Sequence, residues 1–114
     1  MTIIIVMIPR RKQFELIYPP IIKQHLGFIE AQYYSLIREA LETQLQFEPE
    51  VETRNRKPLK RPAVFGAKWE IRFGADNRFR VFYRVDHDQQ QVVILAIGEK
   101  VRNRLFIGGE EVEI

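Results

Sequence analysis

Basic side chains gather in the second half of this 114-residue sequence, and their chemistry is the most readily recognised. The segment from Arg54 to Arg84 holds ten lysines and arginines against Glu70 and Asp76, a net charge of +8, whereas the whole chain carries +3. The planar fork of arginine binds two oxygens of a phosphate or carboxylate and stays protonated. The segment therefore predicts a surface that attracts a polyanion, although a solvated face explains such a run of charges equally well.

Four of these arginines are expected on one face of a sheet. Side chains alternate along a strand, so Arg78, Arg80 and Arg84 share a face, with Arg72 opposite them across a hairpin. Like charges repel, so arginines without matching acids indicate that a ligand supplies the negative charge. Phe82 lies between Arg80 and Arg84, where it either stacks on a base or borders a second hydrophobic cluster.

A three-stranded meander is expected to position these side chains. Alternating apolar and polar residues predict strands over 68–73 and 78–85, joined by turn-forming residues at 74–77. Residues 92–97 are apolar on both faces, which is typical of a central strand, and Gly98 is expected to end it.

The first half of the chain supplies the elements that cover this sheet. A short strand over 14–18 is expected along the free edge of the central strand, followed by a brief helix that starts at Pro20 and stops at Gly27. Apolar residues spaced three and four apart predict a second helix of about 17 residues between Ile29 and Leu45. Residues 47–62 contain three prolines and are expected to form a loop.

These elements define an α+β fold in which two N-terminal helices pack on a small twisted, mostly antiparallel sheet. Residues 1–114 fit one domain, with 1–12 as a possible extension. The apolar run Ile3 to Ile8 is far shorter than the roughly 20 residues of a membrane span, and its basic residues follow it, so no signal peptide or membrane span is expected. An added edge strand there would allow two chains to pair.

Several kinds of chemistry are disfavoured. The chain has no cysteine, which excludes thiolate metal sites and disulfides and favours a cytoplasmic location. His25 lies near a helix C-terminus, where an imidazolium would interact well with the dipole, and His87 lies in a turn; both are expected to be structural or solvated. No metal and no cofactor are expected. The glutamates at 110, 111 and 113 are expected to stay solvated.

Three segments resemble the RelE/ParE superfamily of small toxins that are encoded together with antitoxins. They are WEIRF (69–73), FRVFYRVD (79–86) and VVILAIG (92–98), and the order of the preceding elements agrees as well. The resemblance implies a toxin that cuts mRNA on the translating ribosome or one that acts on DNA gyrase. It also implies a cognate antitoxin, from which the acidic counter-patch is expected.

The resemblance assigns roles to individual residues. In the mRNA-cleaving branch it implies that Arg80 stabilises the charged transition state and that Arg72 and Lys100 are further catalytic positions. Cleavage without metal also needs a base and an acid. Glu70, where the branch has lysine, or Lys100 is the candidate base, whereas the tyrosine of the branch falls at Phe106, which has no hydroxyl.

The remaining candidates are basic or aromatic residues for RNA binding: Lys60, Arg61, Lys68, Arg78, Phe82, Arg84 and Arg102. The leading interpretation is a metal-independent, ribosome-dependent mRNA endonuclease that inhibits translation. The alternatives are a non-nucleolytic gyrase inhibitor of the ParE kind and a toxin-like domain without activity.

Overall fold

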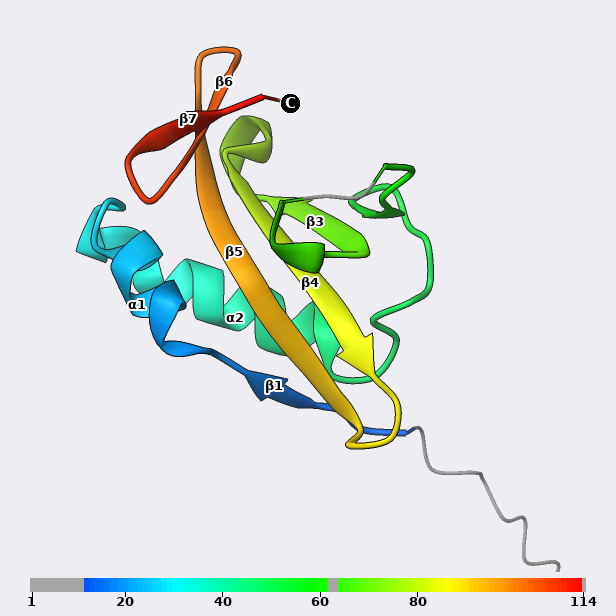
Figure 1. Cartoon of the computed structure of the whole chain (residues 1–114). Coiled ribbons are helices and arrows are strands. Elements are labelled where there is room, and N and C mark those ends of the chain that lie inside the picture. The colour runs from blue at the N-terminus through cyan, green and yellow to red at the C-terminus, as the bar shows by residue number, and fades with distance from the viewer. Residues whose placement is uncertain (1–11, 62–63, 114) are drawn as a thin grey trace, which may run out of the picture.

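The computed structural model describes residues 12–61 and 64–113. In chain order the elements are β1 (Glu15–Ile17), α1 (Pro20–Leu26), η1 (Ala31–Tyr33), α2 (Tyr34–Leu45), β2 (Arg56–Pro58), η2 (Val64–Gly66), β3 (Trp69–Phe73), η3 (Ala75–Asn77), β4 (Phe79–Asp86), β5 (Gln91–Val101), β6 (Arg104–Ile107) and β7 (Glu110–Val112), where η marks a 3-10 turn. Figure 1 shows β5 as a long bent strand through the middle of the molecule.

The sheet is mostly antiparallel, as expected, in the order β2-β3-β4-β5-β6-β7. The other edge of β5 is shared by β1, which pairs in parallel with Gln91–Val93, and by β6, which pairs with Gly98–Val101. The expected place of the first strand is therefore confirmed. Gly98 was expected to end the central strand, but β5 continues through it to Val101. Residues 47–62 were expected to be a loop, but β2 lies within them, and the strands β6 and β7 were not predicted.

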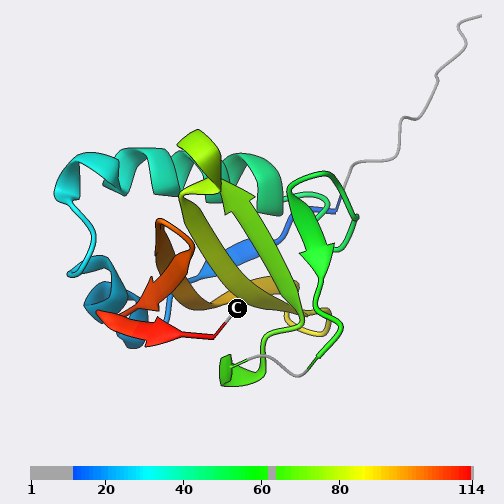
Figure 2. The same ribbon diagram turned by 90° about the horizontal axis from the view of Figure 1, so that it is seen from above.

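Apolar side chains explain why the helices cover one face. Ile22 of α1 and Ile37, Leu41 and Leu45 of α2 are buried against the sheet residues Ile71, Phe73, Phe79, Val81, Tyr83, Val92, Ile94 and Ile97. The helix expected from Ile29 starts later, because η1 precedes α2. A second, smaller cluster of Ala96, Leu105 and Ile107, with Phe82 and Val112 against it, lies on the opposite face. Thus α2 and β7 flank opposite sides of β4 (Figure 2).

Gly98 permits the close approach of β6 to β5. A Cβ atom there would lie 2.9 Å from Ile107 Cγ1 and 3.0 Å from the Phe106 carbonyl oxygen, closer than side chains tolerate. Gly98 also pairs with Arg80 across the sheet. Gly98 was expected to stop the strand. Instead, its lack of a side chain lets β6 pack close to β5.

Arg56 of β2 is a structural residue within the basic segment. Only 6% of it is exposed, and its guanidinium donates hydrogen bonds to the carbonyl oxygens of Gln44 at 2.7 Å, Val51 at 3.0 Å and Glu48. The Gln44 carbonyl belongs to the last turn of α2, where carbonyls lack helical partners. Arg56 therefore ties the end of α2 to the loop that follows it.

We expect Arg56→Ala to lower the free energy of unfolding by about 3 kcal/mol, because several buried carbonyls lose a charged donor. Urea unfolding of the purified protein measures the loss. Arg54→Ala is the matched control, since Arg54 is exposed and its removal should change stability by less than about 0.5 kcal/mol. Equal losses in the two variants would refute the structural role of Arg56.

Two further expectations concern the ends of the chain. Glu110 and Glu111 stay exposed but lie in β7, and Glu111 contacts Arg104 at 3.6 Å. The expectations for Ile3 to Ile8 concern residues outside the described ranges. Within residues 12–61 and 64–113, no helix is long and apolar enough to cross a membrane.

Candidate functional site

The face of the sheet opposite the helices carries the main candidates, and we call the group Glu70, Arg72 and Arg80 the Arg80 site. Register places Arg72 directly opposite Arg80 and Glu70 directly opposite Phe82. Residues opposite each other in a ladder project to the same side. The prediction that Arg72 and Arg80 lie together is therefore confirmed.

Arg80 is the unusual member of this site. It is only 4% exposed, and its Nε atom is buried without a hydrogen-bond partner among the described residues. Burial lowers the pKa of the Arg80 guanidinium, the charge of Arg72 lowers it further, and Glu70 acts in the opposite direction. A buried N–H group of a cation that lacks an acceptor is costly, so this site favours a group that brings negative charge.

Glu70 provides part of that charge from within the protein. Its Oε1 atom is paired with Nε of Arg72, and their side chains are 9% and 41% exposed. The prediction that the arginines lack matching acids was therefore wrong here, because Glu70 alternates onto the same face as Arg72. Two guanidinium groups and one carboxylate leave one net positive charge in the Arg80 site.

Arg78 does not lie on this face. It adopts helical backbone angles at the end of η3, before β4 begins, so strand alternation does not extend to it. Its Nε contacts Glu99 Oε2 at 2.6 Å, its Nη1 donates to the Tyr33 hydroxyl at 2.8 Å, and its guanidinium lies 4.3 Å from the Tyr33 ring centre. The hydrogen bond to Glu99 raises the pKa of Arg78. Arg78 thus joins the sheet to the helical side.

Phe82 has a structural place that the sequence left open. It packs against Ala96 and Leu105 in the second hydrophobic cluster, which is one of the two alternatives. Lys100 pairs with Leu105 of the same cluster and therefore projects to the face of the Arg80 site, where it is half-buried.

The outlying basic candidates are exposed. Arg84 continues the alternation of β4 beyond Phe82, and Lys68 extends β3, since its N–H donates to the Tyr83 carbonyl at 3.1 Å. Both side chains are therefore exposed on the face of the Arg80 site. Lys60 and Arg61 are exposed before η2, and Arg102 is exposed in the turn between β5 and β6 with φ 58°.

Phe106 faces away from the Arg80 site. It alternates with Leu105 and Ile107, so it points to the helical side and lines a groove of about 300 Å³ with His25 and Phe28. A hydroxyl at this position would consequently not reach Arg80. The replacement of the tyrosine of the mRNA-cleaving branch by Phe106 therefore lies outside the Arg80 site.

His25, which lines this groove, is a buried structural residue, one of the two expected alternatives. It is 5% exposed, and its Nδ1 accepts a hydrogen bond of 3.3 Å from the Ile97 backbone N–H, which requires an unprotonated nitrogen. Ile97 lies where neither β1 nor β6 pairs with β5, so its N–H needs this acceptor. Burial lowers the pKa of His25.

The lowered pKa predicts a pH dependence of stability. The unfolded chain binds a proton at His25 below about pH 6.5, whereas the folded chain resists protonation. As the pH is lowered through this range, His25 therefore reduces the free energy of unfolding by at most about 1.4 kcal/mol for each pH unit. We expect His25→Gln, which keeps an acceptor, to lose less stability than the parent between pH 7.5 and 5.5. Parallel curves for the two proteins in denaturant titrations would contradict this.

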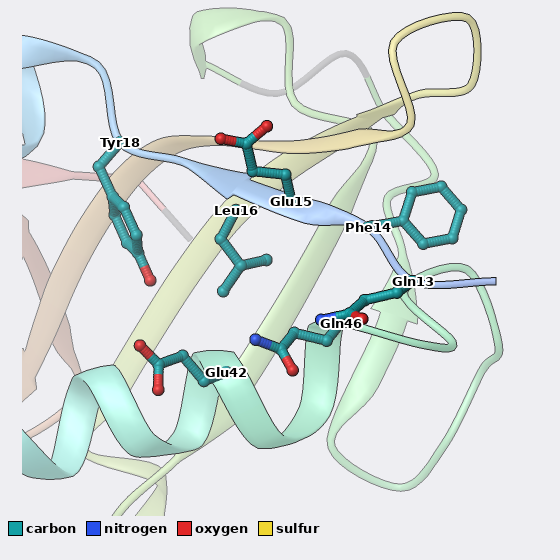
Figure 3. A pocket seen from close by; sticks show the side chains of 7 residues that line it. All are labelled: Gln13, Phe14, Glu15, Leu16, Tyr18, Glu42 and Gln46. Atoms are coloured by element: carbon teal, nitrogen blue, oxygen red, sulfur yellow. The ribbon is translucent and has the colours of Figure 1, made fainter. Parts of the chain in front are cut away.

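A pocket beside the first strand suits polyanions poorly. A pocket of about 410 Å³ lies between β1 and α2, where Leu16 and Tyr18 point toward Glu42 and Gln46 (Figure 3). Glu15 and Glu42 are its charged lining residues, and burial followed by Glu42 raises the pKa of Tyr18. In the described part of the chain, no three His, Asp or Glu side chains gather in a way that would hold a metal ion.

The architecture matches that of a protein from a toxin-antitoxin pair. It is similar to a chain in the toxin-antitoxin complex RelBE2 from Mycobacterium tuberculosis, with a TM-score of 0.60 and 22% sequence identity over 77% of this chain and 99% of that chain. At this identity the likeness shows the fold alone. No curated protein matches the sequence.

The family follows from the sequence match. The model for the ParE toxin of the type II toxin-antitoxin system, parDE, matches residues 10–104. This chain therefore belongs to the ParE toxin family and is the toxin of a toxin-antitoxin module. The resemblance to the RelE/ParE superfamily is confirmed.

Proposed function

We propose that this toxin acts by binding DNA gyrase, as a non-nucleolytic inhibitor of the ParE kind. The observation that carries the proposal is the state of the Arg80 site: Arg80 is 4% exposed and Arg72 is already paired with Glu70. Metal-free RNA cleavage needs an exposed charge at the phosphate and groups that move protons. Binding a protein surface needs no groups that move protons.

The positions of the other candidates support the same proposal. Phe106 and His25, which sequence reasoning weighed for chemistry, lie on the helical side. Arg84 and Lys68 remain exposed on the face of the Arg80 site, where positive charge attracts an acidic protein surface and speeds its encounter. The matching family description, the toxin of parDE, agrees with this branch.

An antitoxin is the expected partner of this surface. The similar structure is a toxin-antitoxin complex, and the net positive charge of the Arg80 site calls for an acidic partner. A cytoplasmic location fits both gyrase and antitoxin. A homodimer through the N-terminal strand is a hypothesis about residues outside the described ranges.

Cleavage of mRNA on the ribosome is the second candidate. The unpartnered Nε of Arg80, with Lys100 on the same face, is an arrangement that can stabilise a pentacoordinate phosphate. Arg72 would orient the phosphate and Glu70 would act as base. In this scheme no residue is assigned as the general acid, because Phe106 lies on the helical side, and the candidate base Glu70 is paired with Arg72, which is why we place it second.

Induced expression without antitoxin separates the candidates. We expect arrested growth with a DNA-damage response and no new discrete mRNA 5′ ends. Arg84→Glu should weaken the effect about fivefold, since it reverses an exposed charge on the proposed face. Glu39→Lys, an exposed change on α2, is the control and should keep full toxicity. Discrete mRNA cuts would favour the nuclease, and undisturbed growth would indicate an inactive domain.

A further inference from the structure

Glu70 occupies the position that an acidic ligand of the Arg80 site would need. Its carboxylate lies on the same face as the two cross-strand arginines and is bonded to one of them. Among the residues that the structure describes, the Nε of the neighbouring Arg80 is buried and has no acceptor. The site is therefore filled only in part, by a carboxylate from its own strand.

We infer that Glu70 is an internal competitor: a carboxylate of an acidic protein partner binds Arg72 and Arg80 by displacing Glu70 from Arg72. The inference rests on the proposed function, because it concerns the same site, and adds how the affinity of that site is set. A partner must break the internal ion pair before it gains its own, so Glu70 weakens binding and favours partners that offer a well-placed carboxylate.

The shape of the site favours a carboxylate over a phosphodiester. Arg80 is 4% exposed, and Ile107 of the second hydrophobic cluster pairs with Gly98, the residue opposite Arg80. An Asp or Glu side chain presents its charge at a narrow tip, whereas the phosphate of RNA carries a sugar on each side. Glu70 itself demonstrates that a side-chain carboxylate fits beside Arg72.

Glu70 also has a structural effect that must be separated from competition. Without its charge, Arg72 and Arg80 face each other directly and repel, so a neutral variant should be less stable. If Glu70 had only a structural role, its replacement would lower both the stability of the toxin and its affinity for the ligand. A competitor, when replaced, lowers stability but strengthens binding, and these opposite signs identify it.

The test measures binding of a fluorescent hexaglutamate peptide by the purified toxin at low salt. We expect Glu70→Gln, which keeps the size of the side chain, to bind about tenfold more tightly than the parent while melting at a lower temperature. Glu99→Gln is the matched control, because Glu99 is also paired with an arginine but with Arg78 on the helical side. It should leave the peptide affinity unchanged.

A double-mutant cycle assigns the effect to the ion pair. In an Arg72→Gln background, Glu70→Gln should change the affinity less than twofold, because no pair remains to be broken. Unchanged or weaker peptide binding by folded Glu70→Gln overturns the inference. Glu70→Asp, whose shorter carboxylate withdraws from Arg72, serves if Glu70→Gln does not fold, and should bind the peptide more tightly than the parent.

Binding of a six-nucleotide uridine RNA in parallel tests the ligand class. We expect the gain in Glu70→Gln to be larger for hexaglutamate than for the RNA, and a larger gain for the RNA would overturn the assignment to carboxylate. These measurements use no gyrase. A toxin that fails to inhibit gyrase but shows the expected gain would refute the proposed target and leave the competition intact.

Discussion

Pairing of β4 with β5 is the constraint on which the rest of the structure depends. The two strands stay paired from Phe79 with Glu99 to Asp86 with Gln91, through one register shift next to Phe82. The far edge of β5 then holds β1 at one end and β6 at the other. Because each pair projects to one side, this ladder decides which residues reach the helices and which reach the Arg80 site.

The charge balance of the Arg80 site connects the fold to the proposed function. β3 and β4 bring two arginines together, and β3 also supplies the carboxylate that neutralises one of them. The other, Arg80, stays buried, and its Nε has no partner within residues 12–61 and 64–113. A protein that keeps such a charge loses stability unless a partner completes the site, which suits a toxin that passes between an antitoxin and a target.

Strand alternation was enough to predict β3, β4 and the shared face of Arg72 and Arg80, because apolar residues alternate cleanly there. It failed at Arg78, because the backbone turns just before the strand begins. In the sequence, Arg78 and Arg80 are two residues apart and therefore look like alternating strand residues. It also missed Arg56, since the carbonyls at the end of α2 and in the loop after it come together around its guanidinium only in the fold. The internal pairing of Glu70 was within reach, because Glu70 and Arg72 are two residues apart on one strand.

Inhibition of purified DNA gyrase tests the central claim most directly, that this toxin acts by binding a protein target rather than by cutting RNA. The measurement is the supercoiling of relaxed plasmid by gyrase during titration with the purified toxin. We predict that supercoiling stops near one toxin per gyrase binding site and returns when antitoxin is added. Full supercoiling activity at a large molar excess of folded toxin would contradict binding of gyrase as the mode of action.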